Sequence, residues 1–123
     1  MALTYPSRVA RNHPPPLWPL RLFKVVEDSM RPALRPGDGL VGRRGGAPET
    51  GELRVFRDPR LSTRWLVKRV GEVYGTGADA IFEARSDNPK APGAVDSHEL
   101  GWVSAAGTYR VVYTVRAPGR RDQ

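Results

Sequence analysis

The chain has 123 residues, 39% of them hydrophobic, and a formal net charge of +7 at pH 7. This length favours a single domain with one modest core, and the lack of cysteine excludes disulfides, thiol nucleophiles and thiolate metal sites. The basic residues are scattered rather than gathered into a stripe with interleaved aromatic residues, so we expect no nucleic-acid binding. The chain has only two histidines, so we expect no metal or other cofactor.

Residues 1–20 contain five of the twelve prolines and no acidic residue. We predict that they form a Pro-rich, flexible N-terminal arm. Nothing in the chain approaches the ~20 apolar residues that span a bilayer, and the N-terminus lacks a signal-peptide pattern. We therefore expect a cytoplasmic protein without a transmembrane segment. Peripheral membrane contact through Leu17, Trp18, Leu20 and Arg21 stays an alternative.

Short runs of β-branched and aromatic residues recur between turn signals rich in glycine and proline. No segment shows a sustained apolar period of about 3.6 residues, which a long amphipathic helix would require. We predict one mostly β domain over residues 21–117, built of antiparallel sheets, and a polar tail over 118–123. The predicted strands are 22–26, 39–42, 53–56, 65–74, 80–84 and 109–115.

One serine, Ser29, stands where the chain is predicted to change direction. It follows the first predicted strand and precedes Pro32, which suits the first turn of a helix. We therefore expect Ser29 at a strand-to-helix junction, close to backbone N–H groups without helical partners. A serine in such a place is either a helix cap or a nucleophile whose own N–H helps to bind an oxyanion.

One lysine, Lys68, interrupts an apolar run in a chain that has seventeen arginines and three lysines. Strand alternation places Lys68 on the same face as Leu66 and Val70. If that face is buried, desolvation disfavours the ammonium form and lowers the pKa of Lys68. A neutral amine can then act as a general base. The alternative is a lysine whose stem follows the sheet while its ammonium reaches water.

Three segments resemble, in family order, the sequence boxes of the type I signal peptidases. The first, Ser29-Met30-x-Pro32-x-Leu34-x-Pro36-Gly37-Asp38, is similar to the nucleophile box, and Val67-Lys68-Arg69-Val70 is similar to the lysine box. The third box usually reads Gly-Asp-Asn, then Asp-Ser-Arg, then Gly. It is matched here by Ser86-Asp87-Asn88-Pro89, Asp96-Ser97 and Gly101-Trp102-Val103.

This resemblance implies a serine endopeptidase with a Ser-Lys dyad. Ser29 would be the nucleophile and Lys68 the general base, and the backbone N–H of Ser29 would form part of the oxyanion hole. The third box implies supporting roles around the site for Asp87, Asn88 and Asp96. Asp96 would be placed to pair with Arg69 or another basic residue.

The resemblance also implies a fold and a substrate. The expected fold is the coiled antiparallel β-sheet fold of signal peptidases and LexA, with one short helical turn after the nucleophile. The expected partner is an extended polypeptide that loses an N-terminal signal or propeptide. A short chain without a membrane anchor most resembles the maturation proteases of nickel-type superoxide dismutase, which remove an N-terminal propeptide.

The chain departs from the family pattern at several positions. Glu27 and Asp28 precede the serine where the family has Gly or Ser-Gly, and two carboxylates near a lysine favour its charged form. Ala94 aligns with the family serine that orients the lysine. His98 aligns with the final arginine of the third box, and we expect it to be a surface or structural residue.

Two other functions are compatible with the sequence. A LexA/UmuD-type regulator also uses a Ser-Lys dyad but cuts its own chain upstream of the serine. A catalytically degenerate protease fold would instead bind peptides without cutting them, and the acidic residues before Ser29 and the alanine at position 94 favour this alternative.

Overall fold

The structure is a computed structural model, and it describes residues 2–4, 19–91, 94–95 and 97–118. Every strand pairing among these residues is antiparallel, so the predicted mostly β fold is confirmed. The strands are β1 (Ala2–Thr4), β2 (Leu20–Val25), β3 (Gly39–Arg44), β4 (Leu53–Asp58), β5 (Leu61–Tyr74), β6 (Ile81–Arg85), β7 (Val103–Ser104) and β8 (Tyr109–Val115), with a 3₁₀ helix η1 (Gly77–Asp79) and a short helix α2 (Ser97–Leu100).

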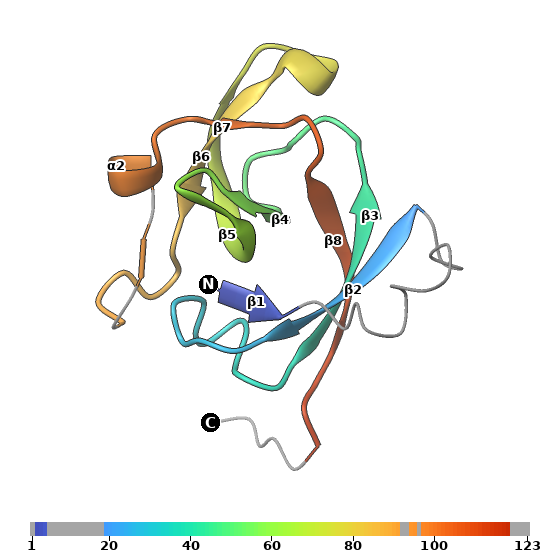
Figure 1. Cartoon of the computed structure of the whole chain (residues 1–123), viewed down its shortest axis with the longest axis vertical. Coiled ribbons are helices and arrows are strands. Elements are labelled where there is room, and N and C mark those ends of the chain that lie inside the picture. Colours follow the sequence, from blue (N-terminus) through green and yellow to red (C-terminus); the bar gives the residue numbers. More distant parts are fainter. Residues whose placement is uncertain (1, 5–18, 92–93, 96, 119–123) are drawn as a thin grey trace.

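The strands form one sheet in the order β1-β2-β3-β8-β4-β5-β6-β7. A further pairing of β1 with β5 closes the first six of these strands into a ring, which we call the strand ring. Figure 1 shows β1 lying between the ribbons of β2 and β5. β6 and β7 extend the sheet beyond the ring from the second half of β5.

All six predicted runs fall on strands of the sheet, although β5 begins at Leu61 rather than at residue 65. The elements that were not predicted are short: β1, β7, η1 and α2. β1 lies inside the predicted flexible arm, where residues 2–4 pair with two neighbouring strands. Residues 5–18 of that arm and residues 119–123 of the predicted tail lie outside the described residues.

Alternate residues of β4 and β5 enter two separate hydrophobic clusters. Val55 and Val67 pack with Phe23, Trp65 and Tyr109 in the first cluster, whose aromatic rings meet with centroids 5.2–5.9 Å apart. The second cluster takes the intervening residues of the same strands and includes Phe56, Leu66, Val70, Phe82 and Ala84. Both faces of this strand pair are therefore buried, which explains the nearly continuous apolar run around Lys68.

A testable consequence concerns the first cluster, where β3 passes close to two aromatic rings. A Cβ at Gly42 would lie 3.0 Å from the Tyr109 Cβ and 3.2 Å from the Phe23 ring, whereas a Cβ at Gly39 would meet only ordinary contacts from 3.5 Å. We expect Gly42→Ala to lower the free energy of unfolding by roughly 1–3 kcal/mol, because the core must shift to admit the methyl group.

Urea denaturation of the two alanine variants measures this difference. Gly39→Ala is the matched control on the same strand, and it should be neutral or slightly stabilising because it removes backbone freedom from the unfolded chain. Equal stability of the two variants would show that the packing around Gly42 is looser than described.

Candidate active site

Ser29 and Lys68 meet in the interior of the protein. Both residues are 0% exposed, and the Lys68 Nζ lies 3.2 Å from the Ser29 Oγ. They are 39 residues apart in the chain, so the fold and not local sequence creates the contact. Of the two sequence interpretations of Lys68, the structure excludes a lysine whose ammonium reaches water, and it matches the buried alternative.

The segment after β2 turns sharply and holds Ser29 against β5. The Arg31 N–H donates to the Asp28 carbonyl at 3.0 Å, and the Leu34 N–H donates to the Met30 carbonyl at 2.8 Å. Met30 and Leu34 are buried in the first hydrophobic cluster and anchor this turn. In place of the expected helical turn after Ser29, the structure therefore has two hydrogen-bonded turns, 28–31 and 30–34, and no helix.

The turn signal that follows Leu34 closes the loop back onto β2. Gly37 has a φ of 95°, a conformation that favours glycine, and its N–H donates to the Val25 carbonyl at 2.7 Å. The buried Asp38 carboxylate accepts hydrogen bonds from the backbone N–H groups of Arg35 and Ala117, both at 3.0 Å. This carboxylate fixes the loop that carries Ser29 to the end of the last strand.

Lys68 lies on the edge of β5 that faces β1 and β6, between the residues that pair with these two strands. Leu66 on that edge is the partner of Ala2 in β1, and Arg69 is the partner of Arg85 in β6. Lys68 thus lies between the part of β5 that pairs with β1 and the part that pairs with β6. Ser29 approaches the amine in this interval.

A second hydroxyl orients the amine. The Lys68 Nζ donates to the Ser86 Oγ at 2.7 Å, and the Ser86 hydroxyl donates to the Val95 carbonyl at 3.0 Å. Sequence reasoning missed Ser86, because it looked for an orienting serine at the position of Ala94. The signal was present in the third box, where Ser86 stands in the place of the usual glycine.

The third box fastens the serine loop to the end of β6. The Asn88 N–H donates to the Ser29 carbonyl at 2.7 Å, and its side-chain Nδ2 donates to the Asp28 carbonyl at 3.3 Å. The predicted residues Ser29, Lys68, Asp87 and Asn88 therefore converge on one place, whereas Asp96 lies outside the described residues.

Asp87 is the partner that the structure gives to Arg69, one of the basic residues with which Asp96 was expected to pair. The Arg69 Nη2 lies 2.6 Å from the Asp87 Oδ2, and this hydrogen bond raises the pKa of Arg69 above its ordinary value. The ion pair links β5, one residue after Lys68, to the loop that follows β6. It therefore helps to hold Ser86 and Asn88 in position.

The two carboxylates before the serine are paired with arginines. Glu27 contacts the Arg64 guanidinium at 3.2 Å, and Asp28 pairs with Arg31 within the turn. These contacts compensate the negative charges that sequence reasoning expected to oppose a neutral lysine.

No family model matched the chain, and no curated protein or solved structure proved similar to it. No helix among the described residues is long and apolar enough to cross a membrane. In the same part of the chain, no three histidine, cysteine, aspartate or glutamate residues lie where they could hold a metal ion.

The burial of Lys68 gives a stability test. Lys68→Met replaces the side chain by an apolar one of similar shape, so we expect the free energy of unfolding to stay equal or to rise. Lys68→Ala leaves a cavity in the same place, and we expect it to lower that free energy by roughly 2–4 kcal/mol. Chemical denaturation compares the two variants, and a large loss in Lys68→Met would show that the amine is needed for folding.

Proposed function

We propose that this protein is a serine endopeptidase in which Ser29 is the nucleophile and Lys68 the general base. The observation that carries the proposal is the 3.2 Å contact between the Lys68 Nζ and the Ser29 Oγ, with both residues fully buried. A nucleophile and a base within hydrogen-bond reach, with the base oriented by a third group, is the arrangement that activates a serine. Here Ser86 is the third group.

Burial favours the form of lysine that this chemistry needs. Removing an ammonium from water disfavours its charged state, so a buried amine gives up its proton more readily than an exposed one. An arginine could not serve, because its guanidinium stays protonated in proteins. The Ser29 and Ser86 hydroxyls both lie within hydrogen-bond distance of the amine, at 3.2 and 2.7 Å.

The proposed reaction is acyl transfer through a covalent intermediate. Neutral Lys68 accepts the Ser29 proton as the Ser29 Oγ attacks a peptide carbonyl carbon, and the backbone N–H of Ser29 stabilises the oxyanion. When the C–N bond breaks, the Lys68 ammonium donates its proton to the leaving amine. Lys68 then takes a proton from water, whose oxygen attacks the acyl-enzyme and releases Ser29 with its proton restored.

β1 indicates how a substrate could bind. It is an extended segment that pairs on one side with β2, the strand leading to Ser29, and on the other with β5, the strand bearing Lys68. We propose that a substrate peptide takes the place of β1 and forms the same kind of backbone pairing, which is a common mode of peptide recognition. Removal of an N-terminal signal or propeptide, as in the maturation of nickel-type superoxide dismutase, is the narrower proposal and rests on the resemblance of the three boxes.

The first test uses a peptide mixture with mass-spectrometric detection of fragments and a serine-acylating probe with a mass tag. Ser29→Ala and Lys68→Met should each reduce cleavage by at least about 10³-fold, because each removes half of the dyad. The probe should label the original chain on Ser29 and should label neither variant. Cleavage that survives in Lys68→Met would remove the lysine from the mechanism.

The same measurements address the alternatives. The position of a segment of the same chain beside the dyad favours, as a second candidate, a LexA-like protein that cuts itself. Incubation of the pure protein followed by mass determination would reveal a specific cut upstream of Ser29 in that case. A peptide-binding module without catalysis would bind the mixture but leave both the peptides and Ser29 unmodified.

Ser86 is proposed as a positioning residue that acts through Lys68. Ser86→Ala should slow Ser29 acylation by roughly 10–100-fold, because the amine loses its fixed orientation. A hydroxyl that accepts a hydrogen bond from an ammonium favours the charged form, so its removal should lower the pKa of the amine and move the acidic limb of the pH–rate profile to lower pH.

Ser86→Thr keeps the hydroxyl and should restore both the rate and the profile. A slower rate in Ser86→Ala with an unchanged profile would instead assign to Ser86 a purely structural role.

A further inference from the structure

A pocket of about 620 Å³ opens at the end of the strand ring away from the dyad. Five of the six ring strands contribute to its lining, through Arg21 of β2, Arg44 of β3, Arg57 of β4, Trp65 of β5 and Tyr109 of β8, and other lining residues belong to β7 and to the segment between β7 and β8. The volume is that of an ordinary ligand site, and open ends of closed sheets are common places for such sites. We call it the basic pocket.

The position of the basic pocket follows from the antiparallel order of the ring. The starts of β2, β5 and β8 and the ends of β3 and β4 gather at the same end. Ser29 lies beyond the opposite end of β2, and the span from Arg21 to Val25 alone is about 13 Å at ~3.3 Å per residue. Neither dyad residue lines the pocket.

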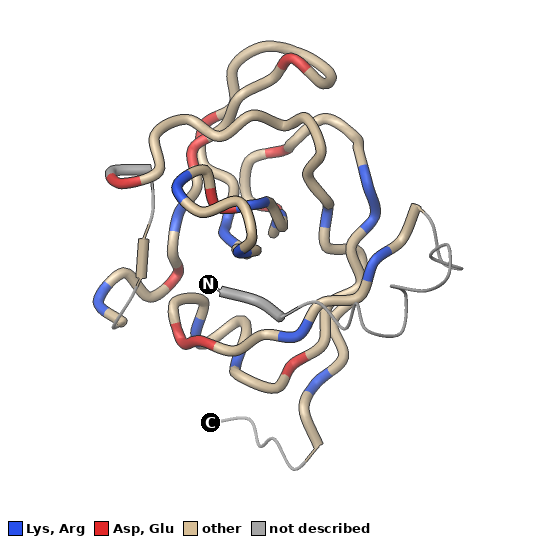
Figure 2. The backbone as a smooth tube through the Cα atoms, in the orientation of Figure 1, with Lys and Arg blue, Asp and Glu red and all other residues tan. Residues whose placement is uncertain are grey.

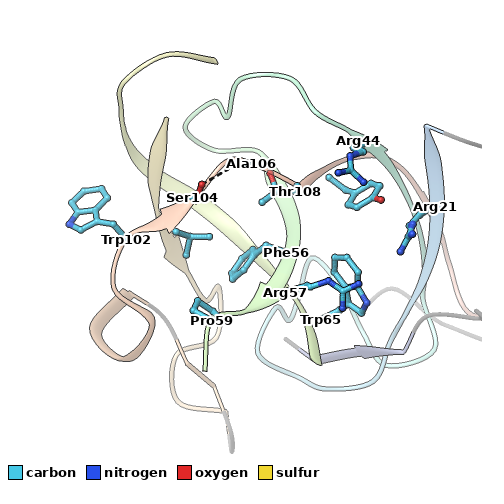
Figure 3. A pocket seen from close by; sticks show the side chains of 13 residues that line it. Arg21, Arg44, Phe56, Arg57, Pro59, Trp65, Trp102, Ser104, Ala106 and Thr108 are labelled. Atoms are coloured by element: carbon cyan, nitrogen blue, oxygen red, sulfur yellow. Dashed lines mark hydrogen bonds between the residues drawn. The ribbon is translucent and has the colours of Figure 1, made fainter. Parts of the chain in front are cut away.

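The lining of the basic pocket carries charge of one sign. Three arginines line it and no aspartate or glutamate does, within the part of the chain that the structure describes. Figure 2 shows basic segments of β2 and β3, which are hydrogen-bonded neighbours, next to each other on this side of the molecule. Figure 3 shows Arg57 beside Trp65, with Arg21 and Arg44 in the same half of the view, whereas Trp102 lies at the other end and points away.

Two of the guanidinium groups lie against the aromatic rings of Trp65 and Tyr109. The Arg57 guanidinium lies 4.3 Å from the Trp65 ring centre, and that of Arg21 lies 5.9 Å from Trp65 and 5.6 Å from Tyr109. Guanidinium groups thus lie against the two rings, and rings in this state are less suited to stacking a nucleobase. A ligand that enters meets guanidinium groups, which bind carboxylates in a planar, two-bonded geometry.

We propose that the basic pocket binds an acidic peptide segment, one that carries several carboxylate side chains, on a partner protein. The proposal goes beyond the peptidase function, because it needs neither Ser29 nor Lys68. Its basis is the complementarity between three arginines from three different strands and a ligand whose charges are spaced along a chain. The strands fix the backbone positions of these arginines, and the ring contacts order the guanidinium groups of Arg21 and Arg57 before a ligand arrives, which reduces the cost of ordering them.

Fluorescence anisotropy of a labelled peptide of alternating glycine and glutamate tests the proposal in the Ser29→Ala chain, where hydrolysis cannot interfere. The corresponding glutamine peptide is the uncharged probe, and labelled oligothymidylate is the nucleic-acid probe. We expect the glutamate peptide to bind best. Arg44→Gln should weaken its binding about tenfold, since one charge-assisted contact is lost.

Arg43→Gln is the matched control, because Arg43 neighbours Arg44 on β3, is equally exposed and does not line the pocket. It should weaken binding less than about twofold. Arg57→Gln, a second change of an exposed pocket residue, should act like Arg44→Gln, and circular dichroism checks that each variant is folded. Three outcomes would overturn the proposal. They are equal losses of binding in the Arg43 and Arg44 variants, equal binding of the two peptides, and tighter, Arg44-dependent binding of the oligonucleotide.

Discussion

A lysine amine within hydrogen-bond distance of two serine hydroxyls in the protein interior is the interaction on which the geometry of the candidate site depends. Three segments distant in sequence must arrive together to form it: the turn after β2, the middle of β5 and the loop after β6. The hydrogen bonds and ion pair of the third box hold these segments together, and the Asp38 carboxylate links the loop that carries Ser29 to the end of β8. Much of the polar network around the site thus serves to fix one contact, because a buried amine is costly unless its partners are held in place.

Sequence patterns predicted the larger elements and the two central residues but not the short-range geometry. The strands could be found because alternation and turn residues report burial directly, and Lys68 stood out as a charge inside an apolar run. Alternation alone could not decide whether its amine was buried, because β4 and β5 carry a hydrophobic cluster on each face. Ser86 and the Arg69–Asp87 pair were missed because they depend on how a loop folds back onto β5, which has no periodic signal. β1 was missed because three residues are too few to show a pattern.

The strand ring gives the molecule two chemically different ends. At one end, the chain leaves β2 and turns to bring Ser29 to Lys68, and both side chains are buried there. At the other end, the same strands start or finish with arginines that stay exposed or half-buried and keep their charge. The same strands reach both ends of the ring. Their register therefore determines how far apart the side chains lie at each end. The register shifts where β8 has one extra residue, Val112, opposite Val41 and Gly42, and where β5 has the extra residues 62–64 opposite Arg57 and Asp58, and both shifts adjust this spacing locally.

The strand β1 has a consequence for how peptide affinity should be understood. It belongs to the same chain as the strands that it joins, so a peptide entering between β2 and β5 exchanges with a tethered competitor. The covalent tether keeps such a competitor close to its binding position, at an effective concentration set by the length of the connection. Under the proposed mode of binding, an incoming peptide would gain only the difference between its own backbone pairing and that of residues 2–4, and discrimination among peptides would rest on their side chains. Weakly matched sequences would be screened out before their carbonyl groups reached Ser29.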